Sequence, residues 1–95
     1  MPDTTHRRRT LHRLRPDVTA CATGDGMVLL DERTGRYWQL NGTGALVVTA
    51  LLDGAAPDEV ADRLASTRPV NRERAAADVT ALLDHLLKEA LVTAS

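Results

Sequence analysis

The run of residues 27–54, MVLLDERTGRYWQLNGTGALVVTALLDG, constrains the fold more than any other part of the chain. An apolar run at 27–30 and a second segment at 36–40 flank a loop at 32–35 that ends in glycine and has a length typical of β-hairpins. Residues 45–52 follow closely, and their apolar side chains run nearly all round a helix. The run therefore predicts a hairpin that leads directly into a helix buried on most sides.

The second strand of this hairpin carries the only two aromatic residues of the chain, Tyr37 and Trp38. If Asp31 faces Arg36 across the loop, the alternation of side chains puts a different set of pairs on each face. One face carries the pairs Leu29–Trp38 and Met27–Leu40, and the other carries Leu30–Tyr37 and Val28–Gln39.

Helix signals mark out two helices directly after the hairpin. Asn41 or Thr43 can cap the first helix, and Gly54 can end it. Pro57 suits the first position of a second helix, which ends before Pro69. The inward-facing residues expected on this second helix are Val60, Ala61 and Leu64.

A third and longest helix is expected from the N-cap Asn71 to about Ala90. Leucine dominates a stripe on it that follows the three-four spacing of one helical face. The stripe consists of Val79, Leu82, Leu83, Leu86, Leu87 and Ala90.

In the segment 14–22, the side chains after Pro16 are mostly short, and some are β-branched. We expect this segment to form a first strand. The fold class is then α+β: a three-stranded antiparallel sheet followed by three helices, as in a winged helix. Residues 1–12 show no sustained period, so we expect a flexible basic arm there and one folded domain over residues 13–95.

Composition limits the classes of function. The formal net charge is -1, but residues 1–20 hold five arginines and two aspartates, so the rest of the chain is acidic. A single cysteine excludes an intrachain disulfide and fits a reducing cytoplasm. No apolar run reaches the length of a signal peptide core or a membrane span, so we expect no membrane association.

Catalytic and metal chemistry find little support. The histidines, His6, His12 and His85, have no partner at a ligand spacing, and no motif surrounds Cys21 or either serine in a way that would activate a nucleophile. We therefore expect no enzyme activity, no metal and no cofactor.

Two features of the sequence could indicate binding of nucleotides or nucleic acid. The glycines at 42 and 44 follow a strand and open a helix, but Val47 stands where a dinucleotide-binding loop needs its third glycine. A winged helix can bind DNA, yet the second and third helices carry more acidic than basic residues, which phosphate repels. A DNA-binding regulator remains an alternative, as does a structural dimerisation module.

The last strand of the sheet offers a different kind of site. Its outer edge leaves a row of backbone groups unpaired, so an extended peptide could add as a further strand, with the leucine-rich helix as a second wall. The simpler alternative is that these side chains only form the core. The residues shared by both interpretations are Trp38, Leu40, Val79, Leu83 and Leu86.

Three segments together resemble the PqqD-like RiPP recognition elements, in particular the small standalone proteins of lasso peptide biosynthesis. They are LLDERTGRYWQLNGTGALVVTALLDG at 29–54, PDEVADRLA at 57–65 and ADVTALLDHLLKEALV at 77–92. The resemblance implies a winged-helix-like fold that binds the leader segment of a ribosomally made precursor peptide as a strand beside the third strand, against the third helix.

The resemblance also implies contacts, partners and an alternative pathway. The peptide-binding residues it implies are Arg36, Tyr37, Trp38 and Gln39 on the strand and Asp78, Val79, Leu82, Leu83 and Leu86 on the helix. Proteins of this kind perform no bond-breaking chemistry and deliver the leader to a separate peptidase and thereby to a cyclase. A peptide chaperone of a radical-enzyme RiPP pathway would share much of the same pattern.

Overall fold

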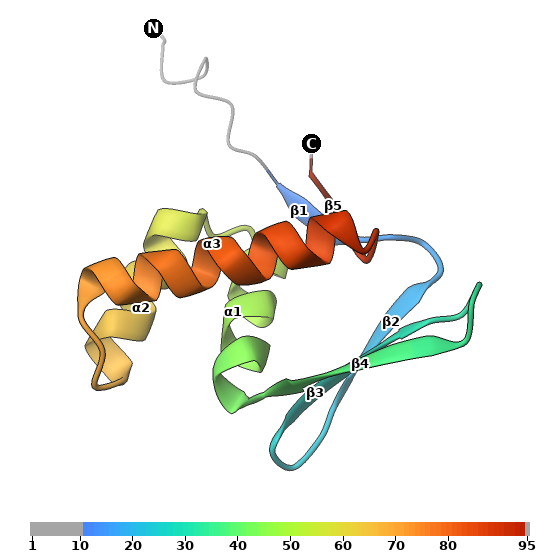
Figure 1. Ribbon diagram of the computed structural model, residues 1–95, viewed down its shortest axis with the longest axis horizontal. Coiled ribbons are helices and arrows are strands. Elements are labelled where there is room, and N and C mark those ends of the chain that lie inside the picture. Colours follow the sequence, from blue (N-terminus) through green and yellow to red (C-terminus); the bar gives the residue numbers. More distant parts are fainter. Residues whose placement is uncertain (1–10, 95) are drawn as a thin grey trace, which may run out of the picture.

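A computed structural model of the chain describes residues 11–94 (Figure 1). The predicted basic arm therefore lies outside the described residues, apart from Leu11 and His12. The strands are β1 (His12–Leu14), β2 (Val18–Ala22), β3 (Gly26–Asp31), β4 (Arg36–Asn41) and β5 (Val92–Ala94). The helices are α1 (Gly42–Leu52), α2 (Pro57–Thr67) and α3 (Arg72–Lys88).

Strands β2, β3 and β4 form an antiparallel sheet in that order, which confirms the predicted α+β class. The β3–β4 register is also the predicted one: Asp31 lies opposite Arg36, and Leu29 lies opposite Trp38. The hairpin loop ends at Gly35, whose φ of 75° lies in the left-handed region that glycine adopts at little cost. The face that carries Leu29, which is fully buried, is the face against the helices.

Side-chain caps begin the helices at the predicted positions. The Asn41 side-chain oxygen accepts a hydrogen bond from the Gly44 N–H at 2.8 Å, and the Asn71 oxygen accepts one from the Arg74 N–H at 2.7 Å. Each cap satisfies one of the backbone donors that a helix leaves free at its N-terminus. Pro57 occupies the first turn of α2, as expected.

Helices α1 and α3 end in the same hydrogen-bond pattern with different residues at the critical position. After α1, Gly54 has a φ of 100°, and the Ala55 N–H donates to the Ala50 carbonyl at 3.0 Å. After α3, Ala90 takes the left-handed conformation, with a φ of 60°, and the Leu91 N–H donates to the Leu86 carbonyl at 3.0 Å. This pairing is the Schellman motif, which favours glycine at the left-handed residue. It ends α3 at Lys88, two residues before the predicted boundary.

The buried residues form two clusters, and α1 contributes to both. Val47, Ala50 and Leu51 pack with α2 and α3 in the cluster we call the helical core, whereas Val48 packs in a second cluster, the sheet core. The predicted burial of α1 on most sides is therefore confirmed. The buried members of the sheet core are Val18, Leu29, Val48, Leu86, Leu91 and Val92.

The prediction of one continuous strand over residues 14–22 is wrong. The Val18 N–H donates to the Arg15 carbonyl at 2.9 Å, so Pro16 lies inside a tight turn that separates β1 from β2. Strand β1 pairs instead with β5, near the other end of the chain, with Leu14 opposite Val92 (Figure 1). This second, two-stranded sheet fixes the chain beyond α3 and buries His12.

We predict that exchanging the left-handed residues of the two Schellman motifs changes stability in opposite directions. Ala90→Gly removes the conformational cost of holding an alanine in the left-handed region. It should raise the free energy of unfolding by about 0.5–1 kcal/mol. Gly54→Ala should lower it by about 1 kcal/mol through backbone conformation alone, because an added Cβ meets nothing within 4 Å. Urea denaturation of both variants measures this; a destabilised Ala90→Gly variant would contradict the assigned geometry.

Candidate functional site

Strand β4 is an edge of the three-stranded sheet. It pairs with β3 on one side and has no strand partner on the other among residues 11–94. An edge strand presents alternate N–H and C=O groups that can bind an added strand. The sheet has a second edge, β2, so edge exposure alone does not decide where a peptide would bind.

The two aromatic side chains of β4 lie on opposite faces of the sheet. Tyr37 is 66% exposed, on the face away from the helices. Trp38 is half-buried and packs against the sheet core, as does Leu40 two residues later. Gln39 is exposed on the same face as Tyr37. Only Trp38, of these two aromatics, therefore faces the space beside α3.

The predicted residues of α3 divide into buried and accessible ones. Val79 and Leu83 belong to the helical core and Leu86 to the sheet core, so these three side chains hold α3 in place. Leu82 is half-buried and packs against both cores, and it is the stripe residue that keeps both core contacts and accessible surface. Asp78 is exposed and forms an ion pair with Arg74 at 3.4 Å.

An ion pair connects the two sides of the site at the start of β4. The Arg36 Nη2 atom lies 3.9 Å from the Glu89 Oε1 atom at the C-cap of α3. The Arg36 guanidinium also lies over the Trp38 ring, 4.9 Å from its centroid, within the range of a cation–π interaction. Sequence patterns missed Glu89, because it lies off the leucine stripe and its partner comes from a strand more than fifty residues earlier.

Asp31 holds the end of the hairpin that presents β4. Its carboxylate accepts hydrogen bonds from the Arg33 N–H at 3.0 Å and from the Arg33 Nε at 3.4 Å. Burial would raise the pKa of Asp31, but these hydrogen bonds, the positive charge of Arg33 and a hydrogen bond from Thr34 outweigh it and lower the pKa below its ordinary value. The charged form of Asp31 therefore stabilises the folded hairpin.

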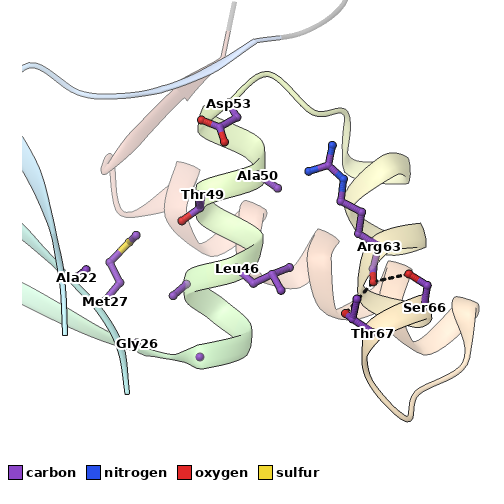
Figure 2. Close-up of a pocket in the computed structure, with 12 residues that line it drawn as sticks. Ala22, Gly26, Met27, Leu46, Thr49, Ala50, Asp53, Arg63, Ser66 and Thr67 are labelled. Atoms are coloured by element: carbon purple, nitrogen blue, oxygen red, sulfur yellow. Dashed lines mark hydrogen bonds between the residues drawn. The ribbon is translucent and has the colours of Figure 1, made fainter. Parts of the chain in front are cut away.

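A cavity of about 540 Å³ lies elsewhere, between α1, α2 and the β2–β3 end of the sheet. Figure 2 shows Leu46 and Met27 at its apolar walls and Arg63 reaching over it from α2, with α3 behind α1. None of the predicted peptide-binding residues lines it. Its charged groups are one cation, Arg63, and one anion, Asp53, so its charge favours neither sign of ligand.

Residues 11–94 contain no cluster of three or more histidine, cysteine or acidic side chains that could hold a metal ion. None of the helices in that part of the chain has both the length and the apolar character needed to cross a membrane.

The fold and this site define an α+β domain with a free sheet edge beside its last helix. Residues 26–92 match the family model of coenzyme PQQ synthesis protein D (PqqD), and the chain belongs to that family. The family resemblance seen in the sequence is thereby confirmed.

Two solved structures are similar to the chain over most of its length. One is described as lasso peptide synthetase B1 complexed with the leader peptide; it is 46% identical, with a TM-score of 0.82 over 86% of this chain and 96% of that one. The other is TbiB1 in complex with the TbiA(beta) leader peptide, 26% identical, with a TM-score of 0.77 over 84% of this chain and 93% of that one. No curated protein matches the chain.

We predict that Asp31→Asn destabilises the protein in a pH-dependent way. A lowered pKa in the folded state means that the Asp31 carboxylate stabilises the fold at neutral pH and loses this effect as the pH falls below about 4. The difference in unfolding free energy between the native protein and the variant should therefore be largest near pH 7 and shrink in acid.

Chemical denaturation at several pH values measures this difference. Asp25→Asn is the control, because Asp25 is an exposed turn residue. A difference for Asp31→Asn that stayed constant from pH 7 to pH 3 would contradict the role of the charge.

Proposed function

We propose that the chain is a non-catalytic protein that binds the leader region of a ribosomally synthesised precursor peptide in lasso peptide biosynthesis. The observation that carries the proposal is the 46% identical lasso peptide synthetase B1, whose structure holds a leader peptide and whose fold this chain shares over 86% of its length. The free edge of β4 beside α3 supplies a surface suited to such a ligand.

Binding would proceed by strand addition at β4. The backbone groups of the edge give affinity without regard to sequence, and side-chain pockets on the α3 side give selectivity. Trp38, Leu40 and Leu82 are three of the partly exposed apolar residues that pack against the sheet core, and they would accept apolar side chains of the leader. Val79, Leu83 and Leu86 would support this surface from beneath.

The role in the pathway would be to present the precursor to other proteins. A bound leader raises the local concentration of the precursor beside a separate leader peptidase, and then beside a cyclase, without any bond breaking by this chain. A peptide chaperone for a radical enzyme is the alternative pathway role, and it would use the same site.

A binding titration tests the proposal. The probe is the leader peptide bound by the 46% identical lasso peptide synthetase B1, and the control is the core segment of the same precursor. We expect saturable leader binding, with a change in the fluorescence of the single tryptophan, Trp38, and no binding of the core. Equal affinity for leader and core, or no binding of either peptide, would contradict the proposal. A preference for duplex DNA would support a DNA-binding regulator instead.

We predict that Leu82→Glu weakens leader binding about tenfold, because it replaces a half-buried apolar side chain at the proposed wall by a charge. The matched control is Ala81→Glu, which adds the same charge at the neighbouring exposed position of α3. Isothermal titration of both folded variants with the leader distinguishes a local effect from a general effect of charge. Equal loss of affinity in both variants would reject Leu82 as part of the wall.

A further inference from the structure

Arg36 is positioned to contact a ligand on the α3 side of β4. It is the first residue of that edge strand and shares a face with Trp38. Its guanidinium lies over the Trp38 ring, at 4.9 Å from the centroid. Stacking on a ring holds a guanidinium plane in place while leaving its N–H edge free to bind a carboxylate through two parallel hydrogen bonds.

The partner that Arg36 has in this structure is weakly held. The Arg36–Glu89 contact of 3.9 Å is an ion pair longer than a hydrogen bond, and the Arg36 side chain is 65% exposed. Exposed ion pairs of this kind contribute little to stability. Within residues 11–94 the Arg36 guanidinium has no side-chain hydrogen bond, so its donors are available to a better acceptor.

Glu89 is also poorly placed as a purely structural residue. It caps the C-terminus of α3, where the helix dipole and free carbonyl groups disfavour a negative charge. The last turn carries the expected positive side chains, His85 and Lys88, and Glu89 departs from that pattern. The Glu89 side chain is 28% exposed, and its carboxylate has Arg36 as its charge partner across the site.

We propose that Arg36 recognises an acidic side chain of the leader peptide, and that Glu89 occupies the position of that carboxylate until the leader arrives. The leader carboxylate would replace Glu89 on the guanidinium, so Glu89 acts as an internal competitor that lowers the affinity of the protein for the acidic leader. This inference rests on the proposed function, because it assigns the chemistry of one contact within the same site.

Binding measurements with a set of leader variants test whether a leader carboxylate replaces Glu89 on Arg36. The probes are variants of the leader peptide of the 46% identical lasso peptide synthetase B1 that carry Glu, Gln or Lys at each position in turn. We expect one position at which Glu binds the native protein about three- to fivefold more tightly than Gln, the effect of a single exposed or half-exposed ion pair. The preference should decrease as salt is added.

Four variants locate the origin of this preference. Arg36→Gln should abolish it, and Glu89→Gln should strengthen binding of the Glu-containing leader about two- to threefold. Arg63→Gln and Asp84→Asn are the matched controls, because each removes one exposed charge of the same sign away from the ion pair, from α2 and α3 respectively. Both controls should bind like the native protein, and circular dichroism establishes that all four variants fold.

The outcomes separate this inference from the function on which it rests. Two results would overturn the proposed replacement of Glu89 by a leader carboxylate while leaving leader binding intact. One is leader binding without a preference for Glu over Gln that depends on Arg36. The other is unchanged binding of the Glu-containing leader in Glu89→Gln. A preference for Lys that disappears in Glu89→Gln would show that Glu89 itself contacts the leader, which also overturns it. Loss of all leader binding in the native protein would contradict the proposed function.

Discussion

The antiparallel pairing of β3 with β4 is the interaction on which the candidate site depends. Its register sets which side chains of β4 face the helices, and a shift by one residue would exchange the two faces. In the observed register, Leu29 is fully buried, and Trp38 and Leu40 pack beside it against the sheet core. The same pairing uses one edge of β4 and leaves the other free.

Local signals were sufficient to predict this part of the chain. The length of the loop and its final glycine, Gly35, defined the hairpin, and the alternation around Asp31 and Arg36 defined its register. Asn41 and Asn71 could be identified as caps because a cap is a contact between residues three apart in sequence. Such features depend on neighbouring residues, so a single sequence contains them.

Contacts between distant segments could not be predicted in the same way. Strands β1 and β5 have three residues each, too few to show a period, and their pairing joins segments near opposite ends of the chain. The ion pair between Arg36 and Glu89 depends on how α3 crosses the sheet, which no local pattern specifies. The stripe on α3 predicted the buried face but not that Val79 and Leu86 would be fully buried while Leu82 stays half-exposed.

The central claim is that the leader adds as a strand at β4, and the two edges of the sheet allow a direct test. Hydrogen exchange of the backbone amides, measured with and without the leader peptide, compares β4 with the opposite edge, β2. Strand addition at β4 predicts new protection at alternate amides of Arg36–Asn41 and none at Val18–Ala22. Protection that appears at β2 instead, or at neither edge under saturating leader, would contradict the central claim.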